Sequence, residues 1–190
     1  MPDADEAADH HRPVYTRTGD DGTTGLLFGG RVRKDAPEPT AYGEVDEAQA
    51  AMGVARATLG DDDPELAGVL ARAERDLWVL MAELATLAAN RSKLEPGATL
   101  VTMEMVGELE RVIDDRAGRF EPPTQFVVPG GDPVSAQLDM ARTVVRRAER
   151  RALAVAAGDS LVVPYLNRLS DLLWTLARHR EGSSLEARDV

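Results

Sequence analysis

The stretch DPELAGVLARAERDLWVLMAELATLAA, residues 63–89, decides the fold class. Its apolar residues recur every three or four positions, which is the spacing that turns one face of an α-helix towards a core. Asp63 and Pro64 are typical of an N-cap and a first helical position. We predict a helix from Pro64 to about Ala89, with Trp78 in the core or at an interface. The apolar stripe consists of Leu66, Val69, Leu70, Ala73, Leu77, Leu80, Met81, Leu84 and Leu87.

Four further segments have the same periodicity. They span about residues 41–59, 100–117, 133–157 and 164–180. Residues 14–40 instead interleave glycines with threonines, which predicts an ordered loop or a loop with short extended pieces. The whole pattern predicts an all-α fold, a five-helix bundle with an ordered Gly/Thr-rich N-terminal loop. We expect one domain over residues 13–180, a disordered acidic tail over 1–12 and a polar C-terminal tail over 181–190.

Composition excludes several classes of function. The 190 residues carry a formal net charge of −11, which disfavours a protein that neutralises nucleic-acid phosphates over its whole surface. The chain has no cysteine, so it offers no disulfide and no thiolate metal site. Its three histidines do not build a three-histidine site, because His10 and His11 lie in the predicted tail and only His179 lies elsewhere. No stretch reaches the roughly 18 to 20 apolar residues of a membrane span, and the acidic N-terminus is unlike a signal peptide. We expect a cytoplasmic protein with no membrane or nucleic-acid partner.

The segment from Thr16 to Thr24 is the first candidate binding site. Its glycines allow the backbone to turn sharply and to present N–H groups to an anion, and its threonines add hydroxyl donors. Arg17 adds a fixed positive charge, and Lys34 follows closely enough along the chain to reach the same ligand. The segment is not a Walker A loop, because the chain lacks that motif's glycine–lysine spacing. The alternative interpretation is an ordinary surface turn.

Arginines crowd the helix predicted over residues 133–157. Arg142, Arg146 and Glu149 fall within an arc of about 60° on its surface. Arg142 and Glu149 border the apolar arc, whereas Arg147 points well away from it. An arginine at the edge of burial is costly without an anion, so we expect a carboxylate from another helix or a ligand phosphate nearby. The alternative is a solvated basic face, which the like-charged pair Arg146–Arg150 disfavours. An RNA-binding helix conflicts with the net charge.

Six motifs, each weak alone, occur in register along the chain. They read YTRTGDDGTT (15–24), RVRKD (31–35), YGEVDE (42–47), FVVPGG (126–131), RTVVRRAER (142–150) and YLNRLSD (165–171). Together, over about residues 14–178, they make the chain resemble the PduO-type ATP:cob(I)alamin adenosyltransferases, the corrinoid adenosyltransferases.

The resemblance implies a five-helix bundle that assembles as a homotrimer with ATP at the subunit interfaces. It implies transfer of the 5′-deoxyadenosyl group of ATP to cob(I)alamin, which forms adenosylcobalamin and releases triphosphate. Cobalamin and ATP are then substrates, and Mg²⁺ is held mainly by the ATP phosphates. The implied protein partners are a flavin-dependent reductase that supplies electrons and a cobalamin-dependent mutase that receives the product.

The resemblance also assigns roles to individual residues. Arg142 would pair with Asp46 across the subunit interface, and Phe126 would lie near the corrin on the side of its lower axial ligand. Gly25 stands where the family often has serine, so a backbone donor would replace a hydroxyl there. The implied catalytic residues are Arg146, Arg142 and Glu149. The implied ATP-binding residues are Thr16, Arg17, Thr18, Gly19, Asp20, Gly22, Thr24, Gly25, Lys34, Arg146, Arg147, Glu149, Arg150 and Asn167.

The implied chemistry suits a chain without a catalytic cysteine or histidine. Cob(I)alamin is itself a strong nucleophile, so the protein contributes proximity and stabilisation of the leaving triphosphate. An apolar Phe126 would block the lower ligand of Co(II) and so raise its reduction potential. Two alternatives remain open: a non-catalytic module that binds ATP or a corrinoid, and a structural bundle with an arginine-rich interface.

Overall fold

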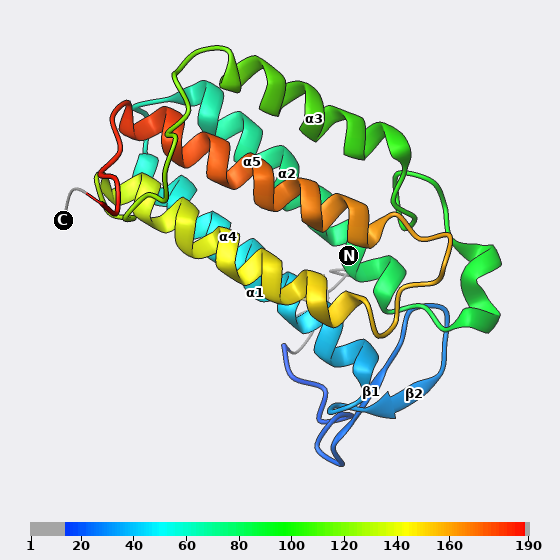
Figure 1. Cartoon of the computed structure of the whole chain (residues 1–190). Helices are drawn as coiled ribbons and strands as arrows, with labels where there is room; N and C mark the ends of the chain where they lie inside the picture. Colours follow the sequence, from blue (N-terminus) through cyan, green and yellow to red (C-terminus); the bar gives the residue numbers. More distant parts are fainter. Residues whose placement is uncertain (1–13, 189–190) are drawn as a thin grey trace, which may run out of the picture.

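In the part of the chain that the structure describes, five long α-helices and one small β-hairpin make up the fold (Figure 1). The computed structural model describes residues 14–188, so the tail predicted over residues 1–12 lies outside the described residues. The prediction of a five-helix bundle is confirmed. The elements are β1 (Thr23–Gly25), β2 (Arg31–Arg33), α1 (Pro37–Leu59), α2 (Pro64–Leu84), the 3₁₀ helix η1 (Ala88–Lys93), α3 (Met103–Ala117), α4 (Pro133–Ala152) and α5 (Val162–Glu181).

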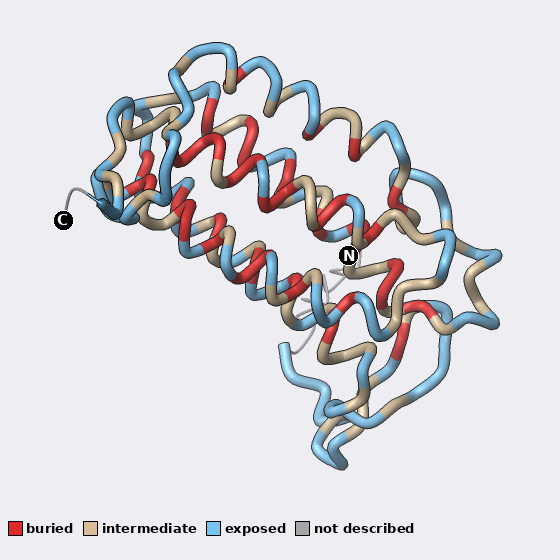
Figure 2. The backbone as a smooth tube through the Cα atoms, viewed as in Figure 1, coloured by how far each residue is buried: buried red, intermediate tan, exposed pale blue. Residues whose placement is uncertain are grey.

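Four of the helices enclose the core, and α3 packs outside them. Helix α4 lies between α1 and α5, α2 packs on α1, and α3 packs on α5 (Figure 1). The buried residues lie on the faces that the helices turn towards one another (Figure 2). Within residues 14–188, no helix is both long enough and apolar enough to cross a membrane.

The predicted apolar stripes form the core. Met52 on α1, Leu77 on α2 and Leu173 on α5 are fully buried, as the helical period requires. Trp78 differs, because 64% of its surface is exposed. The expectation that it lies in the core of the chain is wrong, and its place at an interface stays a prediction.

Several helix ends differ from the predicted ones. Helix α1 starts at Pro37, because proline at a first helical position needs no hydrogen-bond acceptor and has a helical φ angle. Helix α2 stops at Leu84, and α4 stops at Ala152, after which the chain continues in turns. The caps were predicted correctly: Asp63 accepts a hydrogen bond from Leu66 N at 2.9 Å, and Asp132 caps α4 in the same way.

The Gly/Thr-rich segment forms an antiparallel hairpin, with Thr24 opposite Val32. Its tip is attached to the end of α2, because Leu27 N donates to Ala85 O at 2.9 Å. Gly30, with φ +97°, packs so closely on Leu87 that an added Cβ would lie 2.8 Å from that side chain. The predicted loop with short extended pieces is therefore confirmed, and it lies at one end of the bundle (Figure 1).

Helices α1 and α4 run antiparallel. Arg147 of α4 pairs with Glu44 and Glu47, near the start of α1. Pro133 precedes Arg147 by about four helical turns, so α4 begins beside the end of α1. The segment before α4, which carries Phe126, is thus separated from the hairpin by the length of the bundle, about 30 Å for a 20-residue helix.

Candidate functional site

Hydrogen bonds within the hairpin hold the Gly/Thr loop. Arg31 Nη2 donates to Thr18 O at 2.7 Å and to Thr23 Oγ1 at 2.6 Å. Asp21 accepts from the N–H and the hydroxyl of Thr23, and these bonds lower the pKa of its carboxyl group. The hydroxyls of Thr16 and Thr18 lie 2.9 Å apart. The loop is thus fixed by its own residues, while its outer face is exposed to solvent.

Lys34 lies against this loop, as the sequence predicts. Its N–H donates to Gly22 O at 2.9 Å, and a Cβ added to Gly19 would lie 3.0 Å from Lys34 Nζ. A side chain at Gly19 would require the Lys34 ammonium group to move by a few tenths of an ångström. Arg17 adopts a left-handed backbone conformation with φ 60°, and its guanidinium lies over the ring of Tyr15. Two positive charges therefore border a glycine-rich turn, which is an arrangement that suits an anion.

Arg146 and Arg150 project from α4 into solvent. Neither forms an ion pair with a carboxylate among residues 14–188, and Arg150 donates only to the main-chain carbonyl of Arg146, at 2.9 Å. Two uncompensated guanidinium groups one turn apart repel each other, so an anion between them would be stabilising. Lys34 likewise has no carboxylate partner in that part of the chain.

Arg147 does not point away from the bundle, so that prediction is wrong. Its guanidinium pairs with Glu44 at 2.5 Å and also with Glu47, both on α1. These carboxylates raise the pKa of Arg147 further above its ordinary value. The reason for the difference is the long side chain, which reaches across to α1 from a backbone position outside the apolar arc. Its assignment to ATP binding stays a prediction.

Glu149 joins α4 to α5. It accepts a hydrogen bond from Asn167 Nδ2 at 3.3 Å, so two residues assigned to ATP binding from different helices do meet. Both side chains are half-buried at the edge of the core, where the helical geometry places Glu149. The bond orients the Asn167 amide and leaves its carbonyl oxygen available to a ligand.

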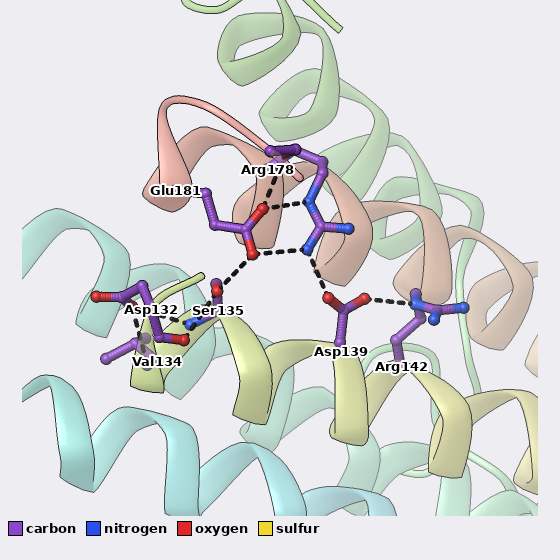
Figure 3. Close-up of polar contacts among 8 residues, drawn as sticks. Asp132, Val134, Ser135, Asp139, Arg142, Arg178 and Glu181 are labelled. Atoms are coloured by element: carbon purple, nitrogen blue, oxygen red, sulfur yellow. Dashed lines mark hydrogen bonds and ion pairs between the residues drawn. The ribbon is translucent and has the colours of Figure 1, made fainter. Parts of the chain in front are cut away.

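Arg142 pairs with a residue of its own helix. Its Nε donates to Asp139 Oδ1 at 3.0 Å, and Asp139 Oδ2 accepts from Arg178 Nη2 at 2.5 Å (Figure 3). Asp46 is exposed on α1 and forms no ion pair within residues 14–188. A pair between Arg142 and Asp46 of another subunit stays a prediction.

Phe126 is the most exposed aromatic residue among those described, with 91% of its surface accessible. It borders a pocket of about 360 Å³ between the segment before α4 and the helices α4 and α5. The wall of this pocket is formed by Gln125, Phe126, Val127, Pro129, Asp139, Arg142, Trp174 and Arg178. An exposed aromatic side chain beside a pocket is typical of a binding surface for an apolar ligand.

One chain therefore carries two separate groups of predicted site residues. The Gly/Thr loop and Lys34 lie at the hairpin end, and Phe126 lies towards the opposite end, where Arg142 lines the same pocket. Further along α4, Arg147 reaches Glu44 near the start of α1, at the hairpin end. Sequence reasoning gave no role to Arg31, Asp139 or Arg178. Arg31 lies within the motif RVRKD, which could have pointed to it. No sequence motif points to the buried pair of Asp139 and Arg178.

A helical bundle with exposed cations, a glycine-rich turn and an apolar pocket has the features of a protein that binds a polyanion together with a large apolar ligand. Residues 14–180 match the family model described as cobalamin adenosyltransferase. The chain belongs to the cobalamin adenosyltransferase family, and it is a transferase.

Relatives span most of the chain. It is 43% identical over 174 residues to the corrinoid adenosyltransferase of Mycobacterium tuberculosis, a match that covers 89% of each chain. It is 36% identical over 180 residues to the corrinoid adenosyltransferase PduO of Salmonella typhimurium, covering 93% of this chain and 52% of that protein. A variant of the PduO-type ATP:corrinoid adenosyltransferase from Lactobacillus reuteri, solved with cobalamin and ATP, superposes with a TM-score of 0.84. It is 26% identical, and the alignment covers 93% of this chain and 97% of that one.

Proposed function

We propose that the protein transfers the 5′-deoxyadenosyl group of ATP to cob(I)alamin and releases triphosphate. Family membership supports the reaction class, and the similar Lactobacillus reuteri structure, which holds cobalamin and ATP, supports the two substrates. The bond that forms joins cobalt to C5′ of the ribose, and the C5′–O bond of ATP breaks. Cobalt is oxidised from Co(I) to Co(III), and triphosphate leaves with the electron pair.

We propose further that each site is built from two copies of the chain, in a homotrimer. The observation that carries this proposal is the separation of the hairpin from Phe126 by about 30 Å along the bundle. Cobalt and C5′ must meet at bonding distance, so one chain cannot use its own Gly/Thr loop and its own Phe126 for one reaction. A neighbouring chain in a closed ring would bring its loop to the exposed arginines of α4.

In this arrangement the loop and α4 bind opposite sides of the triphosphate. Lys34, Arg17 and the loop amides bind phosphate oxygens from one side, and Arg146 and Arg150 bind them from the other. Charge grows on the triphosphate as the C5′–O bond breaks, so fixed cations lower the barrier more than they strengthen ATP binding. Glu149 and Asn167 orient the nucleoside part, because their mutual hydrogen bond fixes both side chains.

Mg²⁺ fits this site as an ion held mainly by ATP. Mg²⁺ prefers phosphate oxygens, one or two carboxylates and water. Among residues 14–188 no group of three or more His, Cys, Asp or Glu side chains is arranged to hold a metal. Asp20 and Asp21 lie on the loop itself, and Asp20 is the carboxylate that we assign to the ATP side of the site. Mg²⁺ supplies charge neutralisation there.

The pocket beside Phe126 is the proposed corrinoid site. A flat apolar side chain in contact with the lower face of the corrin would displace the lower axial ligand and exclude water from that side. The four-coordinate Co(II) that results is reduced more easily, which makes the nucleophile accessible to an electron donor.

The test is a spectroscopic turnover assay. The purified protein with ATP, Mg²⁺ and cob(I)alamin under strong reductant is expected to give the absorption spectrum of adenosylcobalamin and one triphosphate per turnover. Calorimetric binding of ATP without any triphosphate release would favour a non-catalytic binding module. A chain that neither binds ATP nor changes the corrinoid spectrum would be a structural bundle.

A further inference from the structure

A buried chain of ion pairs links α4, α5 and the C-terminal segment (Figure 3). Arg178 is 2% exposed and Asp139 is 3% exposed. Besides Asp139, the Arg178 guanidinium contacts Glu181, with Nε 3.1 Å from Oε2. Asp139 binds a guanidinium with each of its carboxylate oxygens, because Arg142 occupies the other one.

Glu181 connects this chain to the residues that follow α5. Its carboxylate accepts from Ser184 Oγ at 2.9 Å and from Ser135 Oγ, at the start of α4, at 2.8 Å. The side chain of Glu181 is almost fully buried. Its partners come from three segments, because Arg178 lies on α5, Ser135 on α4 and Ser184 after the end of α5. The conformation of the chain after Gly182 is therefore fixed from inside the bundle.

Residues 183–188, which we name the C-terminal strap, pair with the segment that carries Phe126. Val128 N donates to Leu185 O at 2.8 Å, and Ala187 N donates to Phe126 O at 2.8 Å. Val127 and Glu186 form an antiparallel bridge between these two hydrogen bonds. The backbone of Phe126 is thus bound directly by the strap, although its side chain projects into solvent.

The buried ion pairs are better explained by positioning than by stability. The free-energy cost of removing two charges from water offsets most of their electrostatic attraction. Apolar residues of similar size would therefore stabilise a core at least as well. This network also ends at the wall of the Phe126 pocket, where Arg142 uses only its Nε for Asp139. Its remaining N–H groups form no hydrogen bond within residues 14–188 and are available at the wall of the pocket.

We propose that the strap, held by Glu181 and Arg178, is a positioning element for the corrinoid half of the reaction. It fixes the Phe126 segment at the wall of the pocket, while Asp139, through the same network, fixes Arg142 in that wall. Glu181 acts through the Phe126 segment, and Asp139, which is buried at the wall of the pocket, acts through Arg142, so both are positioning residues. The inference rests on the proposed function.

Two variants test the strap, and one serves as a matched control. Glu181→Gln weakens the anchor, and a chain that ends at Gly182 removes the strap. Glu65→Gln also takes a carboxylate from a buried arginine, because Glu65 pairs with Arg116 at 2.8 Å, but it leaves the strap intact. The readouts are hydrogen exchange at the Val128 amide, the electron paramagnetic resonance signature of four-coordinate Co(II) with ATP present, and ATP affinity by calorimetry.

Both strap variants are expected to speed exchange at Val128 about tenfold or more. They should also reduce the four-coordinate Co(II) signal and the conversion that starts from Co(II) by about tenfold, with ATP affinity within about threefold of the unmodified chain. The control should behave as the unmodified chain does. A strapless chain with an undiminished Co(II) signal, or a parallel loss of ATP affinity, would overturn the inference. An unmodified chain that forms no adenosylcobalamin would instead refute the proposed function, and exchange at Val128 would still decide whether the strap holds the segment.

Discussion

Replacing Arg146 by alanine is the substitution that most directly separates catalysis from folding. The side chain is exposed, and its guanidinium forms no ion pair within residues 14–188. Arg150 donates to the main-chain carbonyl of residue 146, which alanine retains. Alanine also has the highest helix propensity. The free energy of unfolding should therefore change by no more than about 0.5 kcal/mol.

The effect on turnover should be much larger. Removing one fixed donor from a site where negative charge develops costs about 10²- to 10³-fold in kcat, or about 2.7 to 4 kcal/mol. In the proposed reaction the triphosphate gains charge only as the C5′–O bond breaks, so the KM for ATP should rise less than kcat falls. Arg146→Lys keeps the charge but loses the planar fork, so it should recover only part of the rate.

The assay is the conversion of cob(I)alamin to adenosylcobalamin under saturating ATP, followed by absorption. Arg151→Ala is the matched control, because Arg151 is an exposed arginine on the same helix that also has no carboxylate partner in the described part of the chain. It should keep nearly the full rate. If Arg146→Ala and Arg151→Ala had the same rate, Arg146 would have no role in stabilising the leaving group.

Three further predictions concern the pocket, the core and pH. Phe126→Ala should impair conversion from Co(II) far more than ATP binding, and equal losses of both would contradict the ligand-blocking role. Glu83→Ala removes a buried acceptor of hydrogen bonds from the Val101 N–H and the Ser160 hydroxyl, so it should cost about 3 kcal/mol, measured by denaturant unfolding; a loss below about 1 kcal/mol would contradict this. Burial and nearby arginines lower the pKa of His179 below 6.5, so the unfolded chain binds more protons below that pH. The free energy of unfolding should then fall as pH drops below 6.5 in the unmodified chain and fall less in His179→Gln; identical pH dependence would refute this.

The helices and their buried faces could be predicted because each depends on local sequence. Leu77 belongs to an apolar stripe with the helical period on α2, and Leu173 belongs to such a stripe on α5. Asp63 and Asp132 are of a residue type that is common at N-caps. The ends of α2 and α4 were placed too late, because the apolar pattern continues through residues that form turns. Propensity alone does not show where a helix stops.

The site was predictable only in part, because much of it depends on contacts between distant residues. Lys34 and the Gly/Thr loop are close in sequence, and their association followed from that spacing. Asp139 and Arg178 are 39 positions apart, and each looks like an ordinary surface residue on its own helix. The contact of Arg147 with α1 was missed for the same reason.

We propose that one site uses the Gly/Thr loop of one chain and the α4 arginines of another. Mixed oligomers of Lys34→Ala and Arg146→Ala subunits test it directly, since each variant alone should be nearly inactive. In a random mixture of the proposed trimers, about one interface in four joins an intact loop to an intact α4, so about a quarter of the unmodified activity should return. Mixed oligomers that remain as inactive as the two separate variants would show that loop and arginines do not act across an interface.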